Sequence, residues 1–467
     1  MATIIVQEPK YNQVPVGSDI IFTVSNNTIV ALEKKVKFIA EVHISSINPI
    51  NTAVNTDVIG VFKTTPNNAG VGIFDLSAVL ESYVKADNVA WFGSSYKLAP
   101  PFPIPLPIHL IDKFSINLNA LKYLTIRFKI EYLGATDSSG QQDDDTVRIA
   151  AGESINSSNY SIFNGYLKRS DILRVDITGF GYNLSEFNPD AITDKFLTNA
   201  PTTQYAGLND YGTFAMFQQT DTISYITVKY YDDAGIILQQ EDIYKTWNNG
   251  AYNAFTTDIR THLLYLGIFP ANLQNWSTTF NTLVSLGTIQ GGHYTVQAFG
   301  AAWSTQLYTI NINCPDLKGY EPIRLAWLNQ WGVWDYYTFN KKSTKSISTS
   351  GSTYTQQSGT WNKATFNLSG YKGGKKSFRV NATEKIKMNT DFVSEAEGEW
   401  FEELINSPEI YILEGFQTDL SGSYLNNYVT PVRLTTSSYT KKTVANDKLM
   451  QYTFEVEKAN TLRTQSI

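Results

Sequence analysis

Short runs of alternating apolar and polar residues recur along this 467-residue chain, and Gly, Pro, Asn or Asp bounds most of them. KVKFIAEVHI (35–44), YLTIRFKIEYL (123–133), SYITVKYY (224–231) and QYTFEVE (451–457) are examples. Their period of two is typical of half-buried antiparallel strands. In YYDDAGIIL, Asp232, Asp233 and Gly235 supply the residues that a short hairpin turn tolerates. The sequence therefore predicts a mainly β fold of antiparallel sandwich or barrel domains with a few short helices.

Three segments carry helix signals. In FDLSAVLESYVK (74–85), Asp75 is placed to cap the first turn. TTDIRTHLLYLGIF (256–269) has Asp258 as a candidate cap. In the third segment, about 397–407, glutamates precede an apolar face, and Ser407-Pro408 predicts the end of the helix.

The length predicts several domains, at about one per 100–200 residues. We expect an N-terminal β-sandwich-like domain at 1–155, a central β-rich domain at 156–314 and a C-terminal β domain at 315–467. The polar stretches 134–159 and 341–363 are interpreted as loops that become ordered on assembly, and the proline-rich stretch 99–108 as extended backbone. Pro431 predicts a strand at a sheet edge or a bulge.

Composition argues against several partners. The net charge of −6 and the pI near 5.4 provide no overall basic footprint for nucleic acid. Cys314 is the only cysteine, which excludes an intrachain disulfide and a multi-cysteine metal site. The N-terminal residues lack the pattern of a secretory signal, and no stretch approaches the ~20 apolar residues of a membrane span. We expect a soluble protein, made in a cytoplasm, that binds neither membrane nor specific nucleic acid.

Catalytic and metal motifs are also missing from the sequence. The four histidines, at 43, 109, 262 and 293, are scattered, and no nucleophile elbow, phosphate loop or dinucleotide fingerprint occurs. The acidic run with Asp137 and Asp143 to Asp145 lacks EF-hand spacing and is interpreted as a solvated loop. The prediction is a protein that is not an enzyme, with no catalytic, cofactor or metal residues.

The aromatic segment RLAWLNQWGVWDYYTF (324–339) is the strongest candidate for a functional surface. A turn at Gly332 between two strands would place aromatic side chains on both faces of the second strand. One face would fill a core and the other would meet a second domain or subunit, where Trp and Tyr are enriched. The candidate interface residues in this segment are Trp327, Trp331, Trp334, Tyr336, Tyr337 and Phe339.

A sugar-binding platform is the alternative for this segment. It would need one face open to solvent, and glycoside cleavage would also need two carboxylates. Asp335 and the group Glu395, Glu397, Glu399, Glu402 and Glu403 are the candidate acids. The glutamates are explained more simply as the acidic first turns of a helix, and Asp335 as a turn or strand-edge acid that bonds local backbone.

A basic stretch follows, GYKGGKKSFR, with Lys372, Lys375, Lys376 and Arg379. Lys341, Lys342 and Lys345 add to it. In a chain of net negative charge, this asymmetry favours pairing between subunits over DNA binding. Lys372, Lys375, Lys376 and Arg379 are the second half of the predicted interface.

The last 150 residues resemble a known family. The order YEPIRLAWLNQWGVWDYYTF, FEELINSPEIYIL and YVTPVRLTTSSYTKKTVANDKLMQYTFEVEKAN resembles a C-terminal region of virion structural proteins of phages that infect Bacteroidetes, including the crAss-like phages. The N-terminal phrases SDIIFTVSNNT and GVGIFDLSAVLESYV are similar to the start of such proteins, whereas the middle of the chain is poorly covered.

The resemblance implies a non-enzymatic component of a phage tail or neck, made in the host cytoplasm and located in the virion. It implies a homo-oligomeric ring of six or twelve copies that links portal-side and distal tail parts around a DNA channel. The partners would be other tail, neck or portal proteins, with DNA passing through the lumen without specific binding. The alternative function is a carbohydrate-binding or glycan-cleaving protein of a phage tail tip or a bacterial surface.

Overall fold

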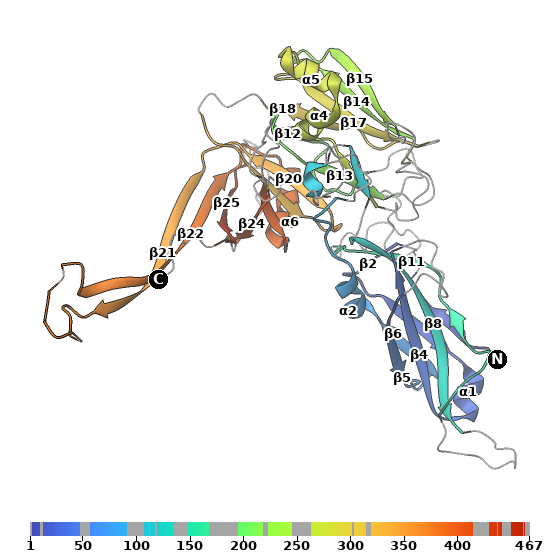
Figure 1. Ribbon diagram of the computed structural model, residues 1–467. Coiled ribbons are helices and arrows are strands. Elements are labelled where there is room, and N and C mark those ends of the chain that lie inside the picture. The colour runs from blue at the N-terminus through green and yellow to red at the C-terminus, as the bar shows by residue number, and fades with distance from the viewer. Residues whose placement is uncertain are drawn as a thin grey trace, which may run out of the picture. The chain divides into compact units, whose positions relative to one another are not determined.

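The computed structural model of the chain forms two compact units, which are described separately. Unit 1 comprises Met1–Asn313 and Leu328–Asp335, and unit 2 comprises Cys314–Trp327 and Tyr336–Ile467. The structure describes residues 2–9, 13–46, 57–90, 107–111, 113–116, 119–134, 147–167, 195–217, 223–244, 263–300, 303–313, 319–361, 363–368, 370–413, 429–436, 438–440, 450–460 and 462. Their helices and strands confirm the prediction of a mainly β fold with several antiparallel sheets (Figure 1).

The first part of unit 1 is a β-sandwich. Its smaller sheet has the order β1-β3-β6, with β1 (Ile4–Gln7), β3 (Ile21–Ser25) and β6 (Val71–Asp75). Its larger sheet has the order β2-β11-β8-β4-β5, with β2 (Gln13–Pro15), β11 (Tyr160–Phe163), β8 (Leu121–Leu133), β4 (Lys34–Ser45) and β5 (Asp57–Thr64). Short strands β9 (Val147–Ile149) and β10 (Ile155–Asn156) also pair with β8. Helices α1 (Asn27–Leu32), α2 (Ser77–Leu80), η1 (Glu81–Tyr83) and η2 (Ile108–Leu110) connect strands.

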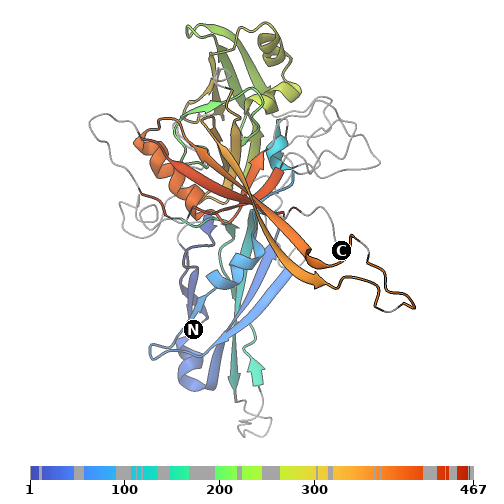
Figure 2. The ribbon, with the colours of Figure 1, turned by 90° about the vertical axis from the view of Figure 1, so that its left-hand side faces the viewer.

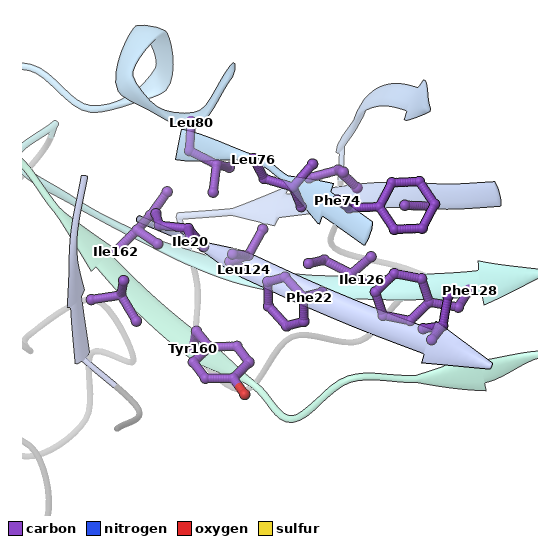
Figure 3. Packing of buried hydrophobic residues seen from close by; sticks show 14 of the residues in the cluster. Ile20, Phe22, Phe74, Leu76, Leu80, Leu124, Ile126, Phe128, Tyr160 and Ile162 are labelled. Carbon is purple, nitrogen blue, oxygen red and sulfur yellow. The ribbon is translucent and has the colours of Figure 1, made fainter. Parts of the chain in front are cut away.

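Aromatic rings fill the space between these two sheets (Figure 3). Phe22 and Phe74 come from the smaller sheet, and Phe128 and Tyr160 come from the larger one. The Phe22 ring lies 5.9 Å from that of Phe128 and 5.7 Å from that of Tyr160, between centroids. The strands can build this layer because alternate residues of each strand point to the same face.

The second part of unit 1 contains two further sheets and two helices. The five-stranded sheet has the order β12-β18-β17-β14-β15, with β12 (Thr203–Ala206), β18 (Tyr308–Ile312), β17 (His293–Phe299), β14 (Tyr225–Tyr231) and β15 (Ile237–Tyr244). The three-stranded sheet is β13 (Thr213–Phe217), β16 (Leu263–Gly267) and β7 (Phe114–Ile116). The helices are α4 (Pro270–Trp276) and α5 (Thr278–Ser285). The β14–β15 turn is confirmed: Asp232 accepts from Ile236 N, and Gly235 has a φ of 80°.

The buried carboxylate of Asp87 connects separate parts of unit 1. Its oxygens accept hydrogen bonds from Asn119 N (2.6 Å), Ala120 N (3.3 Å) and the Tyr265 hydroxyl (3.1 Å). Its backbone carbonyl accepts from Trp334 Nε1 at 2.8 Å. One residue therefore holds the start of β8, strand β16 and the inserted segment Leu328–Asp335 together.

Unit 2 is built on one sheet with one helix. The strand order is β20-β19-β23-β24-β25-β22-β21. The strands are β20 (Trp334–Phe339), β19 (Ile323–Leu328), β23 (Ile410–Leu413), β24 (Val429–Leu434), β25 (Thr453–Lys458), β22 (Gly374–Asn389) and β21 (Thr344–Gln356). Helix α6 (Glu395–Asn406) confirms the predicted C-terminal helix and begins two residues before the predicted 397.

A capping box explains where α6 begins. The Ser394 side chain accepts from Glu397 N, and the Glu397 carboxylate accepts from Ser394 N. Trp400, Phe401 and Leu404 form the buried face. A helix in the segment 74–85 is also confirmed, as α2 and η1. The N-cap of α2 is Leu76, and Asp75, one residue earlier, accepts from Ser77 N at 3.1 Å.

The prediction of a helix at 256–269 is wrong for residues 263–267. Residues 256–262 lie outside the described residues, and Leu263–Gly267 is the buried strand β16. Because β16 is paired on both sides and buried on both faces, its apolar run shows no alternation. Such a run is ambiguous between a strand and a buried helix.

Two predicted loops contain strands. β9 and β10 lie in the stretch 134–159. Residues 135–146 of that stretch, which include Asp137 and Asp143 to Asp145, lie outside the described residues. The prolines at 100–105 also lie outside them. The stretch 341–363 contains the 13-residue strand β21. All but the last residue of β21 are exposed, so neither face required apolar residues and the sequence shows no strand pattern.

The expectation that Pro431 lies at a sheet edge or bulge is wrong, because β24 lies between β23 and β25. The Pro431 carbonyl accepts from Ala459 N at 3.0 Å, one residue past the end of β25. In an antiparallel ladder the nitrogen and the carbonyl of one residue face the same neighbour. The Pro431 nitrogen, which has no hydrogen to donate, therefore faces the end of the β24–β25 ladder.

The domain boundaries need two adjustments. The chain forms two compact units where the sequence predicts three domains, and the boundary predicted at 314 falls at the start of unit 2. The boundary predicted at 155 falls inside β10, and β11 still belongs to the first sandwich. β7, from the predicted N-terminal domain, pairs with β16 from the central one.

We predict that Asp87→Ala lowers the free energy of unfolding by about 3–5 kcal/mol, because three buried donors lose their acceptor. Urea unfolding followed by tryptophan fluorescence would measure the loss. Asp75→Ala is the matched control, since its exposed carboxylate bonds only Ser77 of the adjoining helix and its removal should cost about 1 kcal/mol or less. Equal losses in the two variants would contradict the role assigned to Asp87.

Candidate assembly interface

The aromatic segment forms the predicted strand, turn and strand. β19 and β20 are joined by a turn in which Asn329 N donates to Val333 O at 2.8 Å. Gly332 has a φ of 74°, and a Cβ atom there would lie 1.9 Å from Asn164 O. Only glycine fits this turn, because the conformation and the close approach both exclude a side chain.

The strands of this hairpin have their aromatic side chains buried in unit 2. The Trp327 ring lies 4.8 Å from that of Trp400 on α6, between centroids. Tyr337 and Phe339 pack on Phe401 of the same helix, at 4.9 and 6.4 Å. These contacts make the hairpin and α6 parts of one core.

Other residues of the hairpin strands are also buried. The Arg324 guanidinium donates to Thr338 Oγ1 at 2.8 Å and lies 5.3 Å above the Tyr336 ring. Both Arg324 and Tyr336 are buried, as is Asp335. The buried arginine is held by a hydrogen bond and a cation–π contact, which offset part of its desolvation.

The tip of the hairpin, Leu328–Asp335, belongs to unit 1. Trp331 is buried there, and Trp334 packs edge-on against His109 with ring centroids 4.9 Å apart. The Asn329 side chain donates to Leu197 O, and Tyr166 N donates to Gln330 O. Each interaction joins the tip to a different segment of unit 1.

The six aromatic residues predicted as an interface are therefore covered within this chain. Only Tyr337 is more than marginally accessible, and no coplanar row of rings faces solvent among them. A sugar platform at 327–339 would need such a row. Burial removes the geometric support for that interpretation of the segment.

The candidate carboxylates also have structural positions. Glu395 and Glu397 lie in the first turn of α6, Glu403 is buried on the same helix, and Asp335 is buried in β20. The pKa of Glu41 is lowered by a hydrogen bond from Lys129 on the neighbouring strand, which is a cross-strand ion pair of the sandwich. Among the described residues no group of three or more His, Cys, Asp or Glu could hold a metal ion, and no helix is long and apolar enough to cross a membrane.

The hairpin formed by β21 and β22, residues 344–389, contains Lys345, Lys372, Lys375, Lys376 and Arg379 of the predicted basic residues, and we call it the arm. Lys341 and Lys342 precede it, and Lys341 pairs with Asp391 at 2.9 Å. Lys375, Lys376 and Arg379 are on β22, and Lys372 lies just before that strand. Residues 344–352 pair with 379–387 and residues 353–356 with 374–377, with a bulge between Ser352 and Thr353. Figures 1 and 2 show the two strands extending away from the other strands of the unit 2 sheet.

The outer part of the arm has little support from the rest of the sheet. β25 pairs with β22 only at 385–389, and Ala382 forms a single bridge with Leu462. From Gly374 to Asn381, β22 pairs with β21 alone among the described strands. A two-stranded hairpin is marginally stable in water unless a further layer covers it.

Large apolar side chains are exposed along the arm and its tip. Trp361 is 72% exposed and Tyr371 is 73% exposed. The Trp361 and Phe366 rings pack together, with centroids 5.3 Å apart, without becoming buried. The other exposed members are Ile347, Tyr354, Leu368, Phe378 and Val380. Sequence reasoning identified the cations of the arm and missed these residues, because they are scattered singly through a polar segment.

The arm is strongly basic. It contains eight Lys/Arg and one Glu, a net charge of +7, in a chain of net −6. Near its base, Lys345 pairs with Glu321, and Lys385 with Glu455. In the described residues no carboxylate pairs with Lys363, Lys372, Lys375, Lys376 or Arg379. The outer arm therefore combines exposed rings with unneutralised charge.

Comparison with known proteins provides no relative for this site: no protein-family model matches the chain, and no curated protein matches it in sequence.

We predict that Trp334→Phe lowers the free energy of unfolding by about 1–3 kcal/mol, because the buried Asp87 carbonyl loses its Trp334 donor. The control is Trp361→Phe on the arm, whose exposed indole donates only to Ser358 O, with an expected change within ~0.5 kcal/mol. Thermal and urea unfolding would compare the two. An equal cost at both positions would contradict the buried role of Trp334.

Proposed function

We propose that this chain is a non-enzymatic structural subunit of a phage tail or neck that assembles with copies of itself into a ring. The resemblance of its terminal segments to virion proteins of Bacteroidetes-infecting phages supports the class. The observation that carries the proposal is the arm, a long hairpin that exposes both faces, large apolar side chains and unpaired cations.

Such an arm is suited to a subunit that completes its packing on assembly. Exposed aromatic residues are typical of surfaces that bind another protein, and the lysines beside them suit the polar rim of such a surface. The cost of ordering the outer arm is then offset by the contact that it makes. The role is mechanical: the subunit links portal-side and distal parts of the tail around the DNA channel, and the chain's net negative charge favours free passage of DNA.

Carbohydrate binding is the weaker candidate. The ring row on which it rested, at 327–339, is buried, and the Glu group belongs to helix α6. Trp361 and Tyr371 are the two most exposed aromatic side chains among the described residues, and their rings could still stack on a sugar. Retardation of the protein in polysaccharide gels that is lost in Trp361→Ala, without any assembly, would favour this candidate over the ring.

We predict that the full-length protein forms closed rings at rising concentration, and that Trp361→Ser/Phe366→Ser/Tyr371→Ser remains folded but monomeric. Sedimentation velocity and negative-stain electron microscopy would show this. Tyr205→Ser/Leu286→Ser/Leu307→Ser is the control, since it removes three exposed apolar side chains outside the arm and should leave rings intact. A monomer at every concentration would contradict self-assembly, and rings in the arm variant would contradict the role of the arm.

The virion location has a separate test. Gold-labelled antibodies against the chain should bind to the neck or tail of phage particles that are released when the infected host cell lyses. Label on the capsid alone, or particles that lack the chain by mass spectrometry, would exclude the proposed role.

A further inference from the structure

We propose that the arm of one copy docks on the outer face of the β1-β3-β6 sheet of a second copy. This inference rests on the proposed self-assembly and names the surface that receives the arm. Both surfaces have exposed apolar side chains, which lie beside lysines on the arm and beside Asp75 and Asp19 on the sheet face.

The sheet face is defined by strand register. On β3, Phe22 and Val24 point into the sandwich core, so Ile21, Thr23 and Ser25 lie on the outer face. Across the ladders, Ile4 is opposite Ser25, Ile73 is opposite Thr23, and Asp75 is opposite Ile21. The bulge between Ile5 and Gln7 accompanies a further exposed side chain, Val6. Gln7 is also opposite Thr23, and Val71 is opposite Ser25. We call this set the seat: Ile4, Val6, Gln7, Ile21, Thr23, Ser25, Val71, Ile73 and Asp75.

The seat is apolar and uncovered. Ile4 and Val6 are each 54% exposed and Ile73 is 52% exposed, whereas an aliphatic strand residue commonly points into a core. Thr23 and Ser25 between them are small and nearly buried. Ile4, Val6, Ile21 and Ile73 are therefore the accessible apolar surface of the seat. Exposed apolar groups on one face of a sheet often mark a protein-binding site.

The size of the seat suits one ring of the arm tip. Strands of five residues give the seat a length of about 17 Å, and three strands give it a width of about 10 Å, so its area is about 170 Å². An aromatic side chain buries roughly 150–250 Å² when covered, so one ring matches such a face. Among the described residues of the tip, Trp361, Phe366, Leu368 and Tyr371 have exposed apolar side chains, and Tyr371 is 73% exposed.

Charge favours a second copy as the partner. Unit 1 contains 28 Asp/Glu and 19 Lys/Arg, a net charge of −9, against +7 on the arm. Asp75 lies in the seat, and Asp19 is exposed two residues before β3. The outer-arm cations Lys372, Lys375 and Lys376 have no carboxylate partner in their own unit among the described residues. Complementary potentials of this kind steer association and fix its register.

The test is a cross-link between different chains. In a Cys314→Ser background, Ile73→Cys and Tyr371→Cys are made in separate chains, which are then mixed and oxidised. Both positions are exposed, so each variant should fold and keep the thermal stability of the parent. The expected product is a disulfide-linked dimer that contains one chain of each kind. Tyr371→Cys mixed with Tyr205→Cys is the control, because Tyr205 is equally exposed but lies on β12.

A charge exchange tests the same contact without a cross-link. Lys375→Glu/Lys376→Glu should slow ring formation about tenfold at low salt, and the difference should shrink as salt is added. Asp19→Lys in the same chain should restore part of the rate. Loss of assembly without any restoration would count against an acidic seat.

The outcomes separate the inference from the proposed function. Rings that form while the Ile73 and Tyr371 cysteines do not link, or link no better than the control, would overturn the seat and leave self-assembly standing. Absence of rings altogether would overturn both. Disulfide-linked dimers that contain only chains of the same kind, or an arm that binds duplex DNA or anionic vesicles and not a second copy, would also overturn the seat.

Discussion

Unit 1 depends on the buried residue Asp87, through which its separate segments share one set of hydrogen bonds. The carboxylate accepts from two backbone amides at the start of β8 and from the Tyr265 hydroxyl on β16, and the carbonyl accepts from Trp334. A buried acid is costly unless donors surround it. In this arrangement of the segments, the four hydrogen bonds to Asp87 supply those donors and offset the cost of burial.

The hairpin of β19 and β20 shows how a single short segment can serve two cores. Its strands contribute Trp327, Tyr337 and Phe339 to the aromatic packing around α6 in unit 2. Its tip contributes Trp331 and Trp334 to unit 1. The density of aromatic residues in sixteen positions follows from this double use, since each core takes its own large side chains from the same stretch.

The sequence predicted what alternation and turn chemistry control. Period-two runs located β4, β8, β14 and β25, Asp232 and Gly235 located a hairpin turn, and the glutamates before Trp400 located α6. The aromatic segment was correctly predicted as strand, turn and strand. The misses have physical causes: β16 is buried on both faces and β21 is exposed on both, so neither alternates. Pro431 is tolerated in a central strand because the neighbouring ladder ends beside it.

Half of the proposed interface was predictable from the sequence. The cations of the arm stand out in the sequence because they form a cluster in a chain with few charges. The seat does not stand out in the sequence, because Ile4, Ile21 and Ile73 are residue types that are common in cores. Only the strand register shows that they point outward. The packing of the two sheets decides which face of an alternating strand is exposed to solvent. The local sequence does not carry that information.

The one-sided charge of the arm also restricts the symmetry of any assembly. Two arms of net positive charge repel each other, so a two-fold contact of arm against arm is disfavoured. A basic arm on an acidic sheet is instead a contact between unlike surfaces, and every copy then presents one free arm and one free sheet. Contacts of this kind propagate head to tail, and whether they end in a closed circle or an open helix depends only on the rotation between neighbours.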